Sequence, residues 1–438
     1  MSPRVVVRVA RTAVLVTAAA AAAATAATAT ARSAGAQALA ARVAAVANGV
    51  AQVGYATRPE ACGDGRNVVA LGEFLTASGS VELHGWTNAD CRHGPARLVL
   101  TVRGGEVADV RVHVGGAARV AEGARDLGSV GAVEAADYAL ALAGRLEGRA
   151  AQRAVVAAAV ADSADVWRRL LALARGGAKE ERTQRAAMHW LGAVAPPEAV
   201  GPLTALVRDA RERRAVREGA VAALAHAPGG AGVPALVRVA QGDGAADGWV
   251  REKAIFWLGQ ADDERARGTL RALAAGDTVA AGAREQAIFA LGHSDEGEGN
   301  AAFLRALYPR LQGTRLRERA IQSIAHGDDE ASLRWLLDLA ADGGEPLETR
   351  KQALFWAGQQ DDFPVADLVA VYPRLSGQEL RKHFTFVLSQ RDEDAAVDRL
   401  IDVARRDPDS AVRRQALFWL GQSRHPRARQ YLVEVIER

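Results

Sequence analysis

The chain has 438 residues, of which 49% are hydrophobic and 5% aromatic, and this length is enough for two or three domains of ordinary size. Its 55 basic and 52 acidic side chains give a formal net charge of +3. Nearly every cation is an arginine, which is typical of coding in a GC-rich bacterial genome.

The first 36 residues have the organisation of a secretory signal peptide. Three arginines precede an uncharged segment at 12–31, and the small residues "AGA" at 34–36 fit a cleavage site, with Ala31 as a second candidate. The uncharged segment is also long enough to span a membrane, so an uncleaved anchor is the alternative. We expect residues 1–36 to be removed and the mature chain to be periplasmic or secreted.

Removal of this segment changes the charge balance. Residues 1–36 carry four arginines and no acidic residue, so 51 basic and 52 acidic side chains remain. The mature chain is therefore expected to bind neither nucleic acid nor, once the signal is cleaved, a membrane.

Residues 37–128 are expected to form a small α+β module. The stretch 37–50 reads as a short helix, and 52–57 and 67–71 as weak strands. The clearest β signal is 96–116, where two Val/Leu-rich runs flank Gly104–Gly105, a pair that favours a hairpin turn. Because an isolated hairpin is marginally stable in water, this module is expected to lean on the helices that follow.

The only two cysteines, Cys62 and Cys91, lie in this module. In an exported chain two thiols most simply form one disulfide, which is expected to tie the loops on either side of the sheet. Closing a loop of this length stabilises the chain by about 3–4 kcal/mol in the chain-entropy model.

The remainder, 129–438, begins with a helical stretch at 131–147 and continues as repeats. A string such as "IFWLG" ends at one position of each repeat, which we call the anchor. The anchors are Gly192, Ala225, Gly259, Gly292, Ala325, Gly358, Ser389 and Gly421. A near-constant period of 31 to 34 residues indicates a stacked-repeat architecture, with 155–161 as a degenerate first copy.

Each repeat also contains a second apolar segment, for example "LRWLLDLAA" at 333–341, with its leucines at helical spacing. One repeat is therefore predicted to be a helix A, a polar turn, and a helix B that ends near the anchor. The anchor glycine either ends helix B in a left-handed conformation or permits close packing, and the Ala and Ser at equivalent positions favour packing.

The strings "VREKAIFWLGQ", "AREQAIFALGH", "TRKQALFWAGQ" and "AVRRQALFWLGQ" resemble the short HEAT-like repeats of the phycobilisome-lyase type. The resemblance covers roughly 150–438 and implies a mainly α fold, a right-handed α-α solenoid. It also raises a tetrapyrrole-handling function, but such repeats serve many roles. The HEAT-repeat hydroxylases hold a di-iron centre through His-Glu dipeptides, and this chain has none.

An arginine lies eight residues before seven of the anchors. These are Arg217, Arg251, Arg284, Arg317, Arg350, Arg381 and Arg413. We expect a structural ladder whose rigid guanidinium forks bridge adjacent turns, with Asp247, Asp277, Glu348 and Asp409 in reach. An anion-binding rail is the alternative.

A phenylalanine lies three residues before five of the anchors. These are Phe256, Phe289, Phe355, Phe386 and Phe418. On a helical wheel Phe256 lies opposite the apolar face and beside Glu252, and Glu285 is the equivalent residue in the next repeat. We expect this row, with the two glutamates, to bind a partner on the concave side of the solenoid. The alternative is that the Phe row and the Trp row beside it only fill gaps between repeats.

The residue after the anchor is polar in seven of the eight repeats and is a histidine at 226, 293 and 326. We expect these histidines to bond loop carbonyls, because helices about 8–10 Å apart are too distant for two ligands about 2.0–2.1 Å from one ion. Acidic residues after helix B are expected to be caps for the next helix A, and the alternative is a cation-binding rim. They are Asp262–Asp263, Asp295, Asp328–Asp329, Asp361–Asp362 and Asp392.

The sequence contains no HExxH, GxSxG or P-loop motif and no GxGxxG after a strand, so we expect no enzyme activity, no metal and no cofactor. The favoured function is an exported scaffold that binds a protein or peptide. The alternatives are a ligand-handling protein, such as a tetrapyrrole lyase or chaperone, and a structural envelope spacer. The oligomeric state is left open.

Overall fold

The computed structural model describes residues 35–66, 68–72, 74–77, 91–116, 120–121, 123–243, 247–294, 297–327, 329–360 and 364–437. The expected signal peptide therefore lies almost entirely outside the described residues. The chain divides into two compact units, Met1–Ala235 and Leu236–Arg438, which are described separately. None of the described helices has the length and apolar character to cross a membrane.

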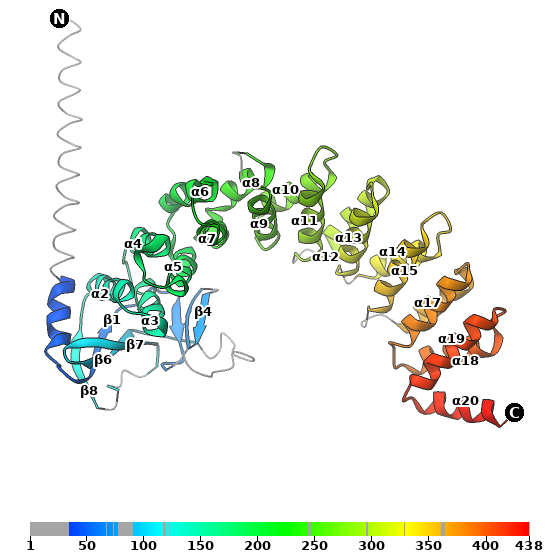
Figure 1. The fold of residues 1–438 in the computed structure, drawn as a ribbon, viewed down its shortest axis with the longest axis horizontal. Coiled ribbons are helices and arrows are strands. Elements are labelled where there is room, and N and C mark those ends of the chain that lie inside the picture. Colours follow the sequence, from blue (N-terminus) through cyan, green and yellow to red (C-terminus); the bar gives the residue numbers. More distant parts are fainter. Residues whose placement is uncertain are drawn as a thin grey trace, which may run out of the picture. The chain divides into compact units, whose positions relative to one another are not determined.

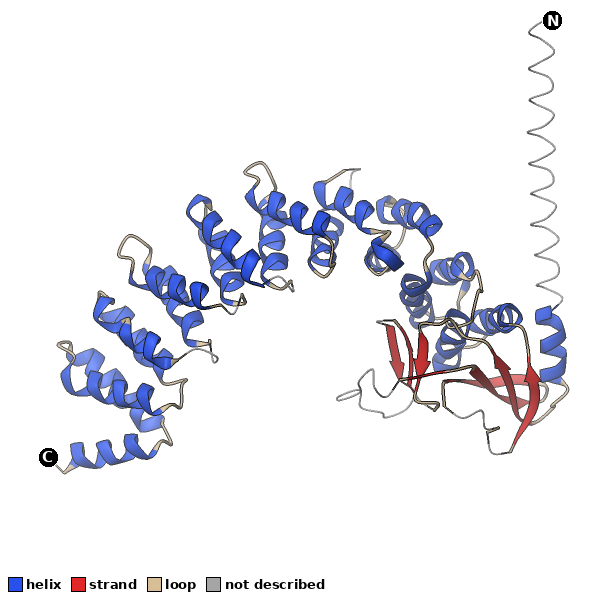
Figure 2. Cartoon of the chain, turned by 180° about the vertical axis from the view of Figure 1, so that it is seen from behind, coloured by secondary structure: helices blue, strands red, loops and turns tan. Residues whose placement is uncertain are grey.

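The first unit contains two four-stranded sheets (Figure 2). The first sheet has the order β7-β6-β1-β8, with β7 Glu106–Val114, β6 Ala96–Arg103, β1 Gly49–Tyr55 and β8 Ala124–Ser129. The second has the order β4-β3-β2-β5, with β4 Phe74–Ala77, β3 Val68–Leu71, β2 Ala61–Gly63 and β5 Arg92–His93. Residues 35–44 precede the strands as a helix, shorter than the expected 37–50.

The predicted hairpin is β6–β7, and its strands pair antiparallel from Ala96↔Val114 to Arg103↔Glu106. Gly104 and Gly105 have φ values of 57° and 79°. Two positive φ values in a two-residue turn suit the right-handed twist of the flanking strands, and glycine adopts them without strain. This is why the Gly-Gly pair fixes the turn.

Cys62 and Cys91 form a disulfide. Cys62 lies on β2, and Cys91 immediately precedes β5, the strand that pairs with β2 through Cys62↔His93. The bond therefore ties β2 to the residue just before its neighbour β5 in the second sheet, and does not join loops on either side of one sheet as expected. The two-residue strand β5 is too short to be visible as an alternating pattern in the sequence.

Hydrogen bonds connect the first sheet and the residues after it to the helices that follow. The Tyr55 hydroxyl on β1 donates to the Ala157 carbonyl at 2.8 Å, and the Arg58 guanidinium donates to the carbonyls of Ala159 at 3.0 Å and Ala164 at 2.7 Å. The carbonyls of Ala157 and Ala159 lie at the end of a helix and have no partner within that helix, whereas Ala164 lies in the turn that follows it. The division expected at 128/129 falls inside β8, and the sheets and first repeats form one compact unit because of this attachment.

Helices follow in A/B pairs along the chain (Figure 1). In the first unit the pairs are α2 Ala132–Arg145 with α3 Gly148–Ala159, α4 Trp167–Ala172 with α5 Glu181–Val194, and α6 Val200–Arg208 with α7 Arg214–Ala225. Helix α8, Val233–Gln241, crosses the division between the units. Helix α3 packs against α5, as one helix B against the next, so the degenerate first copy expected at 155–161 is a repeat in the structure.

The second unit continues the same pattern. Its helices are α9 Gly248–Gly259, α10 Glu264–Ala275, α11 Ala281–Gly292, α12 Gly297–Leu307, α13 Thr314–Ala325, α14 Glu330–Ala341, α15 Leu347–Gly358, α16 Val365–Ala370, α17 Gln378–Leu388, α18 Asp394–Arg406, α19 Ser410–Gln422 and α20 Pro426–Ile436. The odd-numbered helices from α9 to α19 are the B helices, and each packs against the next one. Their buried faces form the core of the row.

The anchor glycines allow consecutive B helices to approach closely. A Cβ added to Gly259 would lie 2.8 Å from the Ala290 side chain, one added to Gly292 would lie 2.4 Å from Ser323, and one added to Gly358 would lie 2.1 Å from Val387. None of these glycines has a positive φ, so the left-handed termination does not occur. The glycines are required for helix-to-helix packing.

Candidate functional site

The candidate site is the exposed side of the B helices in the second unit, which we call the helix-B face. Its aromatic row is half-buried at Phe256, Phe289, Phe355 and Phe386, and Phe418 is 53% exposed. The tryptophans beside them make edge-to-face contacts, for example Phe256 with Trp257 at a centroid distance of 5.4 Å. The rings thus contact each other and still present part of their surface to solvent.

The aromatic contacts connect three consecutive B helices, α11, α13 and α15. The Phe289 ring stacks on His293 at 4.0 Å, His293 lies 4.3 Å from His326, and His326 lies 5.7 Å from Trp356. The two imidazoles are therefore much closer than the spacing of their helices implied. Among the described residues no group of three His, Cys, Asp or Glu side chains is placed to hold a metal ion.

Both histidines are oriented by their own helices. The Nδ1 of His293 lies 2.9 Å from the Phe289 carbonyl, and the Nδ1 of His326 lies 2.8 Å from the Gln322 carbonyl. Because a carbonyl only accepts, each neutral ring carries its proton on Nδ1 and leaves Nε2 as an acceptor. The partners are carbonyls four residues earlier in the helix, and not the loop carbonyls expected.

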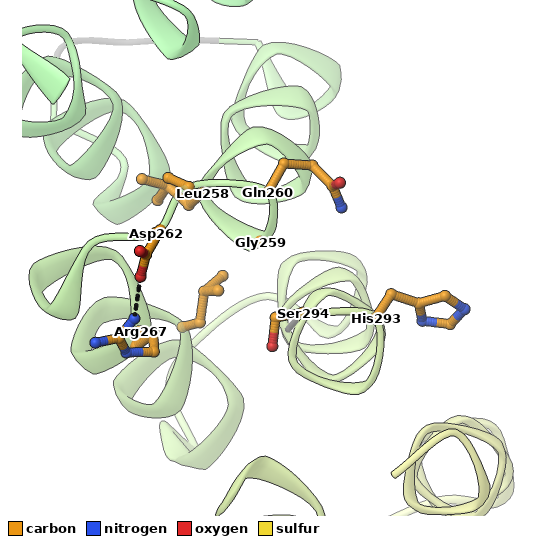
Figure 3. Close-up of a pocket in the computed structure, with 9 residues that line it drawn as sticks. Leu258, Gly259, Gln260, Asp262, Arg267, His293 and Ser294 are labelled. Atoms are coloured by element: carbon orange, nitrogen blue, oxygen red, sulfur yellow. Dashed lines mark hydrogen bonds and ion pairs between the residues drawn. The ribbon is translucent and has the colours of Figure 1, made fainter. Parts of the chain in front are cut away.

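A polar rim follows the aromatic row. It consists of one exposed side chain per repeat, namely Gln260, His293, His326, Gln359, Gln390 and Gln422. Figure 3 shows Gln260 and His293 projecting to the same side, away from the ion pair of Asp262 and Arg267. The rim therefore offers amide and imidazole groups in register along the row.

The two glutamates expected to bind a partner have different surroundings. Glu252 is exposed and makes no ion pair with any described residue. Glu285 is only 13% exposed and pairs with Arg315 at 2.6 Å and Arg319 at 3.0 Å. The Arg319 guanidinium also lies 5.3 Å from the centre of the Phe289 ring, a cation–π contact.

Charge changes sign along the helix-B face. The residue seven before the anchor is Glu252, Glu285 or Glu318 on α9, α11 and α13, and Lys351, Lys382 or Arg414 on α15, α17 and α19. Among the described residues, Lys351 and Lys382 form ion pairs only with glutamates on their own helices, and such pairs near the surface contribute little energy.

The arginine ladder binds the end of helix A within the same repeat. Four members donate from Nε to a carbonyl near the helix A terminus: Arg217 to Val207, Arg251 to Ala240, Arg284 to Ala274 and Arg350 to Ala340, at 2.7 to 3.2 Å. Arg317 and Arg413 likewise donate to the carbonyls of Leu311 and Asp407. These carbonyls lack a helical partner, so the ladder joins helix A to helix B. Of the acidic residues expected nearby, Asp277 lies 3.6 Å from Arg284.

Two repeats contain a cluster that the sequence reasoning missed. Tyr372 and Arg381 both donate to the Asp407 carboxylate of the next repeat, and Tyr308 and Arg317 both donate to Glu345 in the same way. Burial and the neighbouring carboxylate raise the pKa of both tyrosines. The recurrence of "YPRL" at 308–311 and 372–375 was the available signal.

Two of the acidic residues after helix B, Asp263 and Asp329, act as helix caps, whereas Asp262 pairs with Arg267 instead. Asp263 accepts from the backbone amides of Arg265 and Ala266 at the start of α10, and Asp329 accepts from Ser332 at the start of α14. The Arg265 side chain lowers the pKa of Asp263 to about 2. Helix α18 begins after Glu393 without a side-chain cap, so Asp392 is not one. Asp295, Asp328 and Asp361–Asp362 lie outside the described residues.

One small pocket lies between successive repeats of the second unit (Figure 3). Its volume is about 60 Å³, and its lining includes Leu258, Asp262, Arg267, His293 and Ser294. Asp262 and Arg267 pair with each other at 3.1 Å. A space of this size holds little more than water, so the extended face is the better candidate site.

Residues 365–438 match the family model described as HEAT repeats. Human deoxyhypusine hydroxylase in complex with glycerol is 18% identical, over 56% of this chain and 91% of that one, with a TM-score of 0.28. A structure of Kap95p bound to RanGDP is 13% identical, over 68% of this chain and 46% of that one, with a TM-score of 0.37. The search of curated proteins finds no match.

Proposed function

We propose that the second unit is a scaffold that binds a protein or peptide partner along the helix-B face, the face expected to be concave. HEAT repeats typically serve as protein-interaction scaffolds. The observation that carries the proposal is the row of partly exposed aromatic rings on α9, α11, α15, α17 and α19, which Gln322 interrupts on α13 and which a polar rim accompanies along the same helices. Aromatic anchors flanked by polar groups are the usual composition of binding hot spots.

We also propose that the protein is exported and works in the periplasm or outside the cell. The signal-like segment at 1–36 supports this localisation. The disulfide between Cys62 and Cys91 supports it independently, because disulfides persist in oxidising compartments.

The test is cross-linking in the cell that makes the protein, followed by identification of the captured proteins. The variant is Phe256→Ala with Phe289→Ala, and we expect it to lose the captured partners by at least about tenfold. The matched control is Phe303→Ala on α12, a half-buried ring on a helix A that contacts Arg271.

Because removal of two half-buried rings also weakens packing, a second variant is needed. Gln260→Arg with Gln359→Arg alters two exposed rim residues, so the fold is expected to survive, as circular dichroism can check. Retention of all partners by both folded variants would place the binding site elsewhere. A visible absorbance band in the natively purified protein would instead favour the ligand-handling alternative.

A further inference from the structure

The exposed apolar side chains of the described chain gather on its last two helices. Six large hydrophobic side chains are exposed among the described residues, and four of them lie on α19 and α20. They are Phe418, Val433, Val435 and Ile436, which are 53%, 52%, 41% and 83% exposed. Single exposed apolar side chains are common on soluble proteins, but a cluster of them marks an interaction surface. A partner is therefore expected to cover this part of the molecule.

The exposure of Phe418 shows which side of α19 is open. The equivalent ring of the preceding repeat, Phe386, is half-buried and lies 5.4 Å from the Trp419 ring on the next helix B. Phe418 has the same position in its own helix, and the described residues contain no helix B beyond α19 to supply such a ring. The open side is therefore the one on which another repeat would pack.

Helix α20 has one packed side and one open side. It packs against α18 and α19 and buries Ala428 and Tyr431 (Figure 1). At 100° per residue, Arg429, Val433 and Ile436 lie on the opposite side, and all three are exposed. An apolar stripe of this kind is the surface that a helix normally packs against another helix.

The repeat before α20 indicates the direction of the helix that would cover it. There, helix A is α18 and helix B is α19, and the two pack together after the short turn at 407–409. A connection this short makes the two helices antiparallel. Helix α20 is a helix A for which the described residues contain no helix B. A helix that packs on it in the same manner runs antiparallel to it.

The charges of α20 suit a second copy of the same helix. Arg429 lies four residues before Val433 and Glu437 four residues after it, and both are exposed. Neither forms an ion pair with a described residue. In an antiparallel pair with a two-fold axis at Val433, the residue four before the axis meets the residue four after it in the other copy. Each Arg429 therefore meets the Glu437 of the other copy, and both pairs are attractive.

We propose that two copies of the chain associate through α20, antiparallel about a two-fold axis at Val433, with α19 of each copy beside the contact. Val433 and Ile436 form the apolar centre, and two pairs of Arg429 with Glu437 flank it. Because each copy contributes only two helices, the interface is small and the dimer is expected to dissociate at about micromolar concentrations. This inference goes beyond the proposed function, because α20 is a helix A and lies outside the helix-B face.

Sedimentation velocity of the purified chain at low salt, over about 1–200 µM, measures the association. We expect the fraction of dimer to rise with concentration. Val433→Glu places two carboxylates against each other on the axis and is expected to weaken dimerisation at least about tenfold. The matched control is Leu347→Glu on α15, which alters another large apolar side chain that is exposed, and it is expected to leave dimerisation unchanged.

Charge reversal tests the register of the two helices. Arg429→Glu brings carboxylates together at both pairs and Glu437→Arg brings cations together, so each is expected to weaken self-association at least about tenfold. The chain with both substitutions restores both pairs, and its dimer is expected to recover. A mixture of the two single variants is expected to form a heterodimer, because one copy supplies two carboxylates and the other two cations. Such recovery cannot arise from unfolding.

Three results would overturn the inference. A chain that stays monomeric over the whole range leaves the surface to a different protein. Association that Val433→Glu does not weaken shows that the copies meet elsewhere. If the chain dimerises but the mixture of single variants does not, the two-fold antiparallel arrangement is wrong. Each of these results leaves the cross-linking test of the helix-B face unaffected, because that test alters residues on the B helices alone.

Discussion

His293 and His326 stack on each other from neighbouring B helices, with ring centroids 4.3 Å apart and planes inclined by 36°. Each ring is fixed through Nδ1 to a carbonyl of its own helix. The pair connects Phe289 on one side to Trp356 on the other.

This stack predicts a loss of stability in mild acid. Burial lowers the pKa of His293, and the charges of His326 and Arg319 lower it further, against the opposing effect of the bond to Phe289. The unfolded chain therefore takes up a proton at higher pH than the folded chain. Stability is complete above the ordinary histidine pKa of about 6.5 and declines as the pH falls from there through the lowered value.

The measurement is the thermal midpoint between pH 7.5 and pH 5. The variant His293→Phe with His326→Phe keeps two flat rings without a titrating group, so its midpoint is expected to fall less over this range. Part of the decline is expected to remain, because burial also lowers the pKa of His189 and His383. Equal declines in both proteins would show that His293 does not contribute to the loss of stability in acid.

Asp407 is expected to be one of the most costly positions to alter in the second unit. Its side chain has no exposed surface and receives both the Tyr372 hydroxyl and the Arg381 guanidinium. We expect Asp407→Ala to lower the free energy of unfolding by about 2–4 kcal/mol, because a half-buried phenol and a largely buried cation lose their acceptor. Urea unfolding measures this. Glu379→Ala, which removes an exposed pair with Lys382, is the control and should cost less than about 0.5 kcal/mol.

The packing role of the anchor glycines can be tested with one substitution at two positions. A methyl group at Gly292 would overlap Ser323, so Gly292→Ala is expected to destabilise the chain by about 1–3 kcal/mol. Gly421 has the same position in its helix but no atom within 4 Å of an added Cβ. There we expect Gly421→Ala to be neutral or to stabilise by up to about 1 kcal/mol. An equal loss of stability at both sites would show that the effect comes from the local helix and not from packing between helices.

The cap at Asp263 gives a prediction in stronger acid. Asp263→Ala is expected to cost about 1 kcal/mol at neutral pH, because two backbone amides of α10 lose their acceptor. The pKa of Asp263 is lowered to about 2, so its contribution is present above the ordinary aspartate value near 4 and is lost between about 4 and 2. The two proteins should converge in stability over that range. Asp262→Ala, at a side chain that is 97% exposed, should change stability little at any pH.

Much of the repeat architecture could be predicted from local pattern. The spacing of apolar residues located helix A and helix B, because a helix buries one face at a period of 3.6 residues. Ala225, Ala325 and Ser389 replace Gly at the anchor in some repeats, and this favoured close packing instead of a left-handed turn as the role of the glycine. Gly259, Gly292 and Gly358 do make close contacts with the next B helix. The Gly104–Gly105 hairpin was equally readable, since two residues alone set its turn.

The candidate site depended on contacts between repeats, which no local pattern contains. The 4.3 Å approach of His293 and His326, the capture of Glu285 by Arg315 and Arg319, and the joint binding of Asp407 by Tyr372 and Arg381 each join residues about 26 to 35 positions apart. The place of the disulfide could not be predicted for another reason, because the two-residue strand β5 beside it is too short to show an alternating pattern. Sequence periodicity fixes which face each helix buries, whereas the side-chain partners on the exposed face are decided only when one repeat packs on the next.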